Sequence, residues 1–278
     1  MKSKGNNNLI SVENAQEIIF SKFKKLQSIQ KKLIDSNGFI LDEEINALFD
    51  LPNKNNSAMD GFAVRHDDLE INKSLRVVGR VGAESVTDYI IKKDEAMRIM
   101  TGSGIPKGAD SVVPFENTNN NPHKGNDFPD TVLINEIVNK GDNIRLSGQD
   151  YKFGETVVEN GMLIDPAIIG AIASFGINEV NVIRKPVVSL ISTGNEIVMP
   201  GEKLNEGQIY DSNSFAISAA INSSGAECKM HKILSDKKED VDKLYENCSQ
   251  SDLIVTIGGV SKGDFDLIRD AISRKGNI

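Results

Sequence analysis

Two segments of the sequence combine the residue types that bind a phosphate group. One is Ser192–Glu196, and the other is Gly258–Asp266, which begins with two consecutive glycines. Consecutive glycines let the backbone approach a ligand closely and direct N–H groups at an anion, while serine and threonine add hydroxyl donors. We therefore interpret both segments as anion-binding loops, although each alone is also typical of an ordinary turn.

Carboxylates occur in these loops and in other polar turns, and they indicate a second component of the chemistry. Because negative groups repel, carboxylates that face a bound phosphate require a cation between them. Oxygen ligands suit Mg²⁺, so the pattern points to an oxyanion handled together with Mg²⁺, without identifying the substrate. Asp266 is also compatible with a helix N-cap, and Glu196 with a polar turn. The carboxylates considered are Asp60, Asp150, Glu196, Asp236, Asp264 and Asp266.

Both loops are placed by an alternating series of strands and helices that begins at residue 186. Strands are expected at 187–192, 228–234 and 253–257, and helices at 213–223, from Asp236 to 248 and from Asp266 to 274. The first of these helices is expected to be capped by Asp211, Ser212 or Asn213. Such a series predicts a doubly wound parallel sheet, whose ligands bind beyond the carboxyl ends of the strands. The two loops are therefore expected at one sheet edge.

The part of the chain before residue 141 changes from a polar tail and helical segments to short β-rich runs. Residues 1–9 form a polar tail, and Ser11 then caps an apolar helical stripe that continues to Phe23. A second short helix is expected over Asp42–Phe49, before Pro52 and a run of asparagines break the chain. Short β-rich runs follow, separated by turn residues, and they predict a small β domain. These runs lie at 76–78, 98–100, 111–113 and 131–134.

A later helix is expected at 166–175, because Asp165 and Pro166 form a cap with a first-turn proline and Gly176 follows the apolar run. The predicted fold class is therefore multidomain, α/β plus β. Composition does not assign residues 141–180 to a domain, but the boundaries suit an insertion: an elongated discontinuous α+β domain of 10–50 and 141–180, a small β domain inserted at 52–140, and a doubly wound α/β domain at 181–278.

Composition restricts the class of protein. The 278 residues carry a formal net charge of −8, with a sequence pI of about 5.1. An acidic chain is a poor general binder of nucleic acid, and binding an anion requires local donors or a bound cation. No run approaches the ~20 apolar residues of a membrane span, and no secretory signal is recognisable. Cys228 and Cys248 lack metal-ligand spacing, so we expect reduced thiols and a cytoplasmic protein.

Several motifs, in order along the chain, are similar to those of a known family. Asn56–Arg65 reads NSAMDGFAVR, and Arg98–Gly102 begins a block that continues through Val112–Pro114. The set is completed by Ile144–Asp150, Ser192–Glu196, Tyr210–Asn213 and Gly258–Asp264. Together the motifs resemble the molybdopterin molybdotransferase family, which includes bacterial MoeA and the E domain of gephyrin. A GGVS loop alone would be a weak indication, because related molybdopterin adenylyltransferases carry a similar one.

The resemblance implies an architecture and a reaction. A full-length member has four subdomains and forms a homodimer whose active cleft is shared between subunits. The implied substrates are adenylated molybdopterin and molybdate. The phosphoanhydride is cleaved, AMP leaves, and the dithiolene sulfurs bind molybdenum with the assistance of Mg²⁺. The α/β domain is then the pterin-binding domain of a cytoplasmic enzyme of molybdenum cofactor biosynthesis.

The resemblance also implies roles for individual residues. Asp60 and Asp150 line the cleft and are expected to come from the partner subunit. Glu196 and Asp236 flank the α/β pocket, and Asp266 positions the cation or water for phosphoanhydride cleavage. Glu196 and Asp266 are the implied metal ligands. The pterin or phosphate would be held by Gly258, Gly259, Ser261 and Gly263, with Thr193 and Gly194 from the first loop.

Two features depart from the family pattern. Lys262 stands where the family has a small apolar residue, and it either contacts phosphate or faces solvent. The sequence ends at Ile278, whereas the family continues with a Lys-Pro-Gly loop implicated in molybdate binding and a further β domain. On this basis we expect a C-terminally truncated member, and the missing molybdate loop favours binding without turnover.

Three functions are compatible with these observations. The preferred one is insertion of molybdate into adenylated molybdopterin. The second is a fragment that binds the pterin nucleotide, or acts as a scaffold, without turnover. The third is an adenylyltransferase, against which the NSAMDGFAVR motif argues because it lies outside the α/β module. The expected partners are a small-molecule substrate, a second copy of the chain and, as a candidate, the molybdopterin adenylyltransferase, with neither nucleic acid nor membrane.

Overall fold

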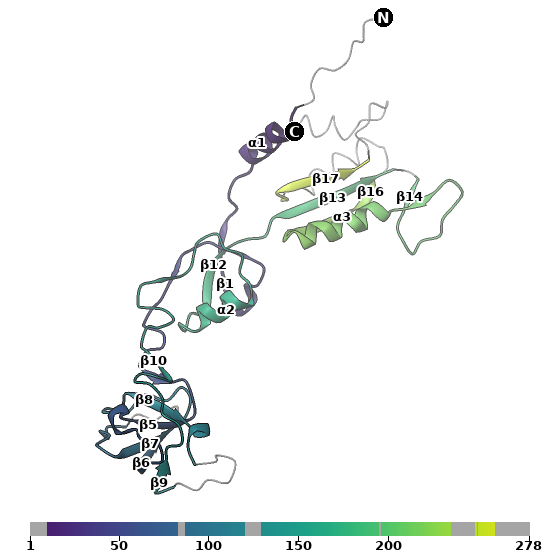
Figure 1. Cartoon of the computed structure of the whole chain (residues 1–278). Coiled ribbons are helices and arrows are strands. Elements are labelled where there is room, and N and C mark those ends of the chain that lie inside the picture. Colours follow the sequence, from purple (N-terminus) through teal and green to yellow (C-terminus); the bar gives the residue numbers. More distant parts are fainter. Residues whose placement is uncertain are drawn as a thin grey trace, which may run out of the picture. The chain divides into compact units, whose positions relative to one another are not determined.

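The computed structural model describes residues 10–82, 87–119, 129–194, 196–234, 248 and 250–258. The chain divides into two compact units, each built from more than one stretch of sequence. One unit comprises Glu44–Glu159 and Ala171–Gly176, and the other comprises the residues up to Glu43, 160–170 and those from Ile177 onward. Figure 1 labels many of the helices and strands of both units. Across the described residues, no helix is both long enough and apolar enough to span a membrane.

The unit around Glu44–Glu159 contains a five-stranded sheet with the order β8-β5-β7-β6-β9. β5 (Gly61–Val64) pairs antiparallel with β7 (Glu95–Ile99) and with β8 (Ser111–Pro114). β6 (Ser74–Val81) runs parallel to β7 and antiparallel to β9 (Thr131–Leu133). The four β-rich runs expected in this region are therefore confirmed as strands.

Strand β5 of this sheet is buried on both faces, which explains why its residues are continuously apolar. Phe62 and Val64 belong to one core cluster, and Ala63 between them belongs to another. Because side chains alternate along a strand, three consecutive apolar residues serve both faces. Phe62 also packs edge-on against Phe115, with ring centroids 5.4 Å apart.

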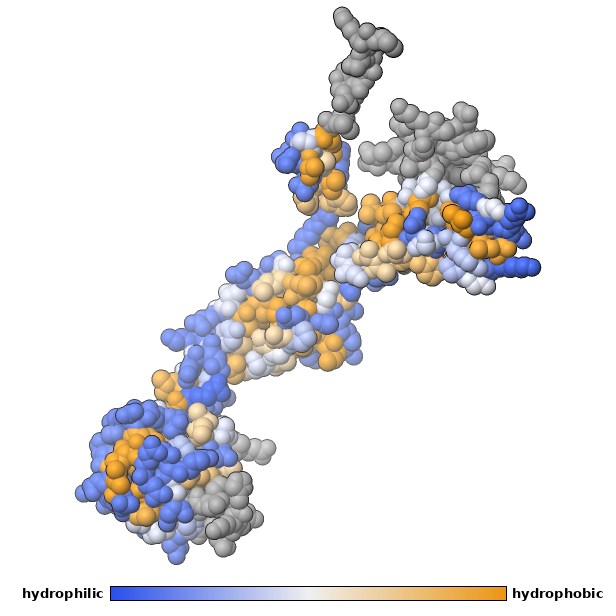
Figure 2. All heavy atoms as spheres, turned by 45° about the vertical axis from the view of Figure 1, so that its right-hand side comes forward, coloured by the Kyte–Doolittle hydropathy of each residue, from blue (hydrophilic) through white to orange (hydrophobic). Residues whose placement is uncertain are grey.

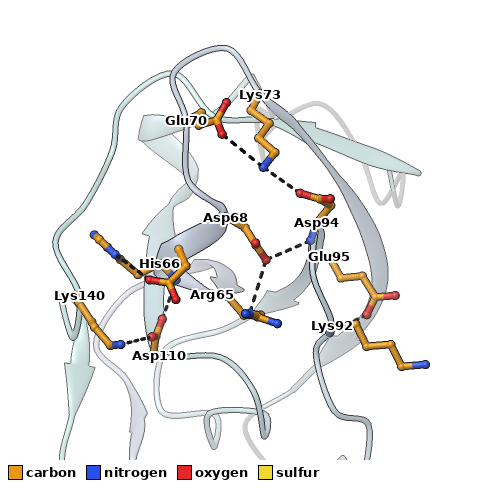
Figure 3. Close-up of polar contacts among 11 residues, drawn as sticks. Arg65, His66, Asp68, Glu70, Lys73, Lys92, Asp94, Glu95, Asp110 and Lys140 are labelled. Carbon is orange, nitrogen blue, oxygen red and sulfur yellow. Dashed lines mark hydrogen bonds and ion pairs between the residues drawn. The ribbon is translucent and has the colours of Figure 1, made fainter.

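Carboxylates hold the loops around this sheet by accepting hydrogen bonds from backbone N–H groups (Figure 3). Asp68 accepts from Asp94 N–H at 3.0 Å, and Asp110 accepts from His66 N–H at 2.7 Å. Burial raises the pKa of Asp110, but the His66 N–H bond and an ion pair with Lys140 outweigh burial, and the pKa is lowered overall. Both carboxylates thus have the partners that a group withdrawn from water requires.

Short strand pairs and single helical turns complete this unit. β4 (Asn56–Ser57) pairs antiparallel with β10 (Ile144–Arg145). β3 (Ile45–Asn46) pairs antiparallel with β11 (Thr156–Val158). The 3-10 turns are η2 (His66–Asp68) and η3 (Phe115–Asn117).

The helix expected over Asp42–Phe49 is wrong, because the structure has the short strand β3 there and no helix. Ile45 and Ala47 are buried whereas Asn46 and Leu48 are exposed, so burial alternates with a period of two residues. The apolar spacing that suggested a helix is misleading because Leu48 does not join the core. Pairing with β11 thus outweighs the local helical pattern.

The other unit contains an antiparallel three-stranded sheet with β12 at its centre. β12 (Glu179–Ile183) pairs with β1 (Ser28–Lys32) on one side and with β2 (Ile40–Leu41) on the other. The 3-10 turn η1 (Leu33–Asp35) follows β1. Val182 and its register partner Leu41 are both fully buried, so the core lies over the face of the sheet that these two side chains share.

Two helices begin where the sequence predicts. α1 (Val12–Lys22) is capped by Ser11, and none of its residues is buried, so its apolar side chains are exposed (Figure 2). α2 (Pro166–Ala173) starts at the expected proline, and Asp165 accepts a first-turn backbone N–H at 2.8 Å. α2 ends two residues before the expected limit of 175, and Gly176 follows with a φ of +76°.

A parallel sheet with the order β16-β13-β17 forms the α/β part of this unit. β13 (Val187–Thr193) is central, between β16 (Glu227–Leu234) and β17 (Leu253–Ile257). α3 (Ser212–Ser223) contacts β13 and β16. The three expected strands and the helix between the first two are therefore confirmed.

The structure decides which residue caps α3 and adds a short strand pair that the sequence did not predict. Asp211 is the cap of α3, because its carboxylate accepts from Ser214 N–H at 3.0 Å. β14 (Ile197–Val198) and β15 (Ile209–Tyr210) form a separate parallel pair. The helices expected from Asp236 and from Asp266 lie outside the described residues.

Candidate functional site

The carboxyl edge of the parallel sheet carries the described parts of both glycine loops. β13 ends at Thr193 and β17 ends at Ile257, and Ser192 lies opposite Ile257 in the register. Gly194 follows β13 at the edge where Gly258 follows β17. The structure therefore brings these two chain segments, which are more than sixty residues apart in sequence, to one place.

Gly258 packs directly against the end of β13. Its φ of +80° lies in the left-handed region, and a Cβ at this position would lie 3.0 Å from the carbonyl oxygen of Thr193. Thr193 Oγ1 in turn donates to the carbonyl oxygen of Ile257 at 3.4 Å. Gly258 itself is exposed. The loop thus requires glycine for two reasons, and its backbone is open to a ligand.

The Glu196 carboxylate lies over Gly194 at the same edge. Gly194 has a φ of +146°, and a Cβ there would lie 2.7 Å from Glu196 Oε1. The Glu196 residue is exposed, and no hydrogen bond or ion pair joins its carboxylate to another described residue. An uncommitted carboxylate oxygen is a suitable ligand for a hard cation such as Mg²⁺.

Ser192 is a further candidate that the sequence reasoning did not single out. Its side chain is 2% exposed, and its Oγ has no hydrogen-bond partner among the described residues. Leaving a buried hydroxyl without a hydrogen-bond partner costs free energy. Ser192 Oγ is therefore a candidate to hydrogen-bond a ligand at this sheet edge. Ser192 could have been found from the sequence, because it is a hydroxyl residue at the end of a predicted buried strand and just before a glycine turn.

A polar network lies within the sheet behind these loops. Ser189 Oγ is 2.8 Å from His231 Nε2 and 2.7 Å from Ser251 Oγ, and Cys248 Sγ is 3.6 Å from the same His231 nitrogen. Burial lowers the pKa of His231, and the nearby Lys229 lowers it further, so the imidazole is neutral at neutral pH. The network connects β13, β16 and the segment before β17, which is a structural role.

In the other unit, three motif segments are joined by backbone hydrogen bonds. Ser57 N–H donates to Ser103 O at 2.9 Å, and Gly102 N–H donates back to Ser57 O at 2.8 Å. Ala58 N–H donates to Asn143 O at 2.9 Å. The NSAMDG segment is therefore held between the segments at 101–104 and 143–150.

Asp60 is oriented by one residue of the second segment. Its Oδ1 accepts hydrogen bonds from Thr101 N–H and from Thr101 Oγ1, each at 2.7 Å. Both bonds use the same oxygen, so Oδ2 has no partner among the described residues. Thr101 belongs to the motif block, but the sequence reasoning assigned no role to it. The pairing depends on strand register, which a linear motif does not show.

Asp150 lies in the third segment and forms an ion pair with Arg145 of the same turn. The two side chains are 40% and 44% exposed, so the pair is solvated and orients the carboxylate more than it stabilises the fold. Asp150 N–H donates to Leu51 O at 2.9 Å, which anchors the turn. Arg145 was quoted within a motif and is a second residue whose local role only the structure shows.

The predicted site residues thus fall into three groups. Thr193, Gly194, Glu196 and Gly258 lie at the sheet edge of one unit, and Asp60 and Asp150 lie in the other unit. Asp236, Gly259, Ser261, Gly263 and Asp266, together with Lys262, lie outside the described residues. Within the described part of the chain, no group of three or more His, Cys, Asp and Glu residues is arranged to hold a metal ion.

Two family models match most of the chain. Residues 10–176 match the model described as "MoeA N-terminal region (domain I and II)", and residues 189–277 match the model described as "Probable molybdopterin binding domain". The first match contains Asp60 and Asp150, and the second contains both glycine loops.

Curated relatives agree with these matches. A protein of Staphylococcus epidermidis named molybdopterin molybdenumtransferase is 37% identical over 265 residues, which cover 93% of this chain and 62% of the relative. A protein of the same name from Staphylococcus aureus (strain Mu50) is 36% identical over 270 residues, which cover 94% of this chain and 62% of the relative. The chain therefore spans 62% of the length of these relatives.

Solved structures share the fold. A molybdopterin biosynthesis MoeA protein from Pyrococcus horikosii has a TM-score of 0.74 and 31% sequence identity, over 96% of this chain and 67% of that one. A second structure, of the molybdopterin biosynthesis MoeA protein from Pyrococcus horikoshii OT3, has a TM-score of 0.78 and 26% identity, over 90% of this chain and 67% of that one.

Proposed function

This chain belongs to the MoeA family, and on that premise we propose that it acts in molybdenum cofactor biosynthesis, inserting molybdate into adenylated molybdopterin with release of AMP. The observation that carries the proposal is the close packing of Gly258 on Thr193 at the carboxyl edge of the parallel sheet. This edge lies within the region that matches a probable molybdopterin binding domain. Backbone N–H groups at such an edge suit the phosphate of a pterin nucleotide.

The sheet-edge residues bind the substrate in this proposal. Thr193, Gly194 and Gly258 contact the pterin or its phosphate through backbone groups and a hydroxyl, and Ser192 Oγ offers another donor. Gly259, Ser261 and Gly263 extend the same loop. The carboxyl edge of a parallel sheet suits this task because the strands hold the backbone donors rigidly. On binding, the substrate therefore loses conformational freedom and the protein loses little.

The carboxylates have separate tasks in this proposal. Thr101 holds Asp60 with Oδ2 free, and Asp150 is held by Arg145, so both can orient groups of the substrate. Asp236 flanks the pterin pocket, and Asp266 orients the water that attacks the phosphoanhydride. Breaking this bond moves negative charge onto phosphate oxygens, so fixed donors near them lower the barrier.

Mg²⁺ fits the donor chemistry of the sheet edge. Glu196 presents an exposed and uncommitted carboxylate, and with Asp266 it would hold the ion. When bound, Mg²⁺ would supply positive charge opposite the phosphate oxygens. Adenylated molybdopterin and molybdate are substrates in this scheme, and no resident cofactor other than Mg²⁺ is proposed.

The wider arrangement is also a proposal. The elongated domain comprises 10–50 and 141–180, the β domain 52–140, and the doubly wound pterin-binding domain 181–278. The active form is a cytoplasmic homodimer in which Asp60 and Asp150 complete the cleft of the other subunit. The molybdopterin adenylyltransferase, which supplies the adenylated substrate, is a candidate partner.

Molybdate-dependent AMP release tests the function. The chain is incubated with adenylated molybdopterin, molybdate and Mg²⁺, and AMP is quantified. Release is expected from the parent chain and should fall in Asp60→Asn and Asp266→Asn. Asp67→Asn is the matched control, because the Asp67 side chain is 72% exposed and lies outside the motifs. A chain that binds the substrate but releases no AMP would be a pterin-nucleotide-binding protein without turnover.

A further inference from the structure

A three-residue connector, Arg184–Pro186, joins β12 to β13 and therefore links the antiparallel sheet to the α/β sheet within one compact unit. Connectors between folded parts are commonly flexible. Here the Arg184 guanidinium binds Asp252 through two hydrogen bonds. Nη1 donates to Oδ2 at 2.7 Å, and Nη2 donates to Oδ1 at 2.6 Å. Asp252 directly precedes β17, so the connector is tied to the α/β sheet.

Asp252 is itself fixed at the start of two strands. Val187 N–H donates to Asp252 Oδ2 at 2.8 Å, and Asp252 N–H donates to Val187 O at 2.8 Å. Because Val187 begins β13, these bonds join the beginnings of β13 and β17. The carboxylate that receives the Arg184 fork therefore has little freedom of its own.

The connector also contacts the antiparallel sheet on its other side. Arg184 N–H donates to Gln27 O at 3.0 Å, immediately before β1. Lys185 packs toward the antiparallel sheet, with its Nζ 4.9 Å from the centroid of the Phe39 ring. A cation over an aromatic face is attracted by the ring quadrupole. The connector is therefore tied to the α/β sheet by the Arg184 side chain, and to the antiparallel sheet by the Arg184 backbone and the Lys185 side chain.

The Arg184–Asp252 pair differs from an ordinary surface ion pair. The two side chains are 30% and 21% exposed, and the contact is bidentate. Bidentate charge-assisted bonds are about twice as strong as neutral ones, whereas exposed single contacts contribute little. The mutual hydrogen bonds are the main cause that lowers the pKa of Asp252 and raises that of Arg184.

We propose that Arg184 is a positioning residue that locks the connector, so that the α/β sheet and the sheet of β1, β12 and β2 move as one body. The lock consists of the bidentate bond to Asp252 on one side and the contacts to Gln27 and Phe39 on the other.

One consequence rests on the proposed function. Thr193 and Gly258 belong to the α/β sheet, and in the proposed homodimer the cleft at this sheet edge is completed by residues of the other subunit. Unlocking the connector leaves the substrate-binding groups of the sheet edge intact but loses their alignment with the rest of the site. The kcat for AMP release then falls while the KM for adenylated molybdopterin is retained.

The lock is tested by a distance measurement that needs no substrate. Spin labels are attached to keto amino acids introduced at Gln30 on β1 and Ala216 on α3, both exposed positions, and the label-to-label distance distribution is recorded. The parent chain is expected to show one narrow distribution. Arg184→Ala should broaden it, and Arg184→Lys, which keeps the charge but loses the fork, should give an intermediate width.

Arg76→Ala is the matched control, because Arg76 also pairs with a carboxylate, that of Glu95, but lies in the other unit. Its distribution should equal that of the parent. The proposal is overturned if the parent chain gives a broad distance distribution. It is also overturned if Arg184→Ala remains folded by circular dichroism and gives a distribution as narrow as that of the parent. If Arg184→Ala does not fold, Arg184→Lys decides in the same way.

The kinetic measurement separates the lock from the proposed function. In Arg184→Lys, kcat should fall about tenfold to a hundredfold with KM within about twofold of the parent, since misplacement by about 1 Å can cost this much. A raised KM with unchanged kcat contradicts the alignment argument. A parent chain that releases no AMP contradicts the proposed function, while the distance distribution still decides the lock.

Discussion

Thr101 donates both its backbone N–H and its hydroxyl to Oδ1 of Asp60, each at 2.7 Å. Two bonds from one residue to one oxygen fix the plane of the carboxylate and leave the second oxygen free. Asp60 precedes β5 and Thr101 follows β7, and the antiparallel register of these strands places Gly61 opposite Ile99. The relationship is therefore created by strand pairing between two motifs about forty residues apart.

Loss of the Thr101 hydroxyl should impair catalysis more than folding. Thr101→Val retains the backbone donor and removes the hydroxyl, and we expect AMP release to fall about tenfold, the size of one hydrogen bond to a charged group. Thr101→Ser retains both donors and should keep most of the rate. Equal rates for the valine and serine variants would show that the hydroxyl does not orient Asp60.

Glu95 should be important for the stability of the five-stranded sheet. It is 4% exposed and accepts from the Tyr89 hydroxyl at 2.9 Å and from Lys92 N–H at 3.0 Å, with Arg76 as its ionic partner. Burial raises the pKa of Glu95, but these bonds outweigh burial and lower it overall. We expect Glu95→Gln to reduce the free energy of unfolding by about 1–3 kcal/mol, measured by urea denaturation.

Glu70→Gln is the control for this measurement. The Glu70 side chain is 75% exposed and makes only a 3.8 Å contact with Lys73, so its loss should leave the denaturation midpoint nearly unchanged. A Glu95→Gln variant as stable as the control would mean that the partners of Glu95 are satisfied equally well by solvent.

Asp252 should contribute to acid lability. The Arg184 side chain is the main cause of its lowered pKa, Val187 N–H adds to it, and burial opposes both. Because the folded pKa lies below the unfolded value of about 3.9, the contribution is fully present above about pH 4. It is lost as the pH falls through the folded pKa. Asp252→Asn should therefore flatten the dependence of thermal stability on pH below about pH 4.

Melting curves recorded from neutral pH to about pH 3 test whether the stabilisation by Asp252 is lost on acidification. The parent should lose stability on acidification faster than the variant, and the two curves should converge at the acidic end. A variant whose curve runs parallel to that of the parent would show that Asp252 is not linked to acid unfolding.

Gly61 should not tolerate a side chain. A Cβ at this position would lie 2.1 Å from the carbonyl oxygen of Val113 on the paired strand β8. The strands would have to separate, so we expect Gly61→Ala to destabilise the protein by about 3 kcal/mol or more. Gly79→Ala is the matched control, because the nearest atom to its Cβ is Met97 Cε at 3.5 Å. Similar melting temperatures for the two variants would refute the clash.

Much of the secondary structure followed from local pattern. The cap at Ser11, the proline start of α2 and the strands β13, β16 and β17 were predicted because capping chemistry and buried β-branched runs act over a few residues. The segment at 42–49 shows the limit of this reasoning. Its apolar spacing favours a helix, but pairing of β3 with β11, more than a hundred residues away, gives it an extended backbone.

The sequence by itself identified the motifs, the family resemblance and the candidate residues Asp60, Asp150, Thr193 and Gly258, because short motifs and glycine loops can be recognised from the local order of residues. Only the tertiary structure decided which partners these residues have. Thr101 reaches Asp60 through strand register, Gly258 reaches Thr193 through parallel pairing, and Arg184 reaches Asp252 across 68 residues. Such contacts depend on long-range pairing of strands, which no linear spacing encodes.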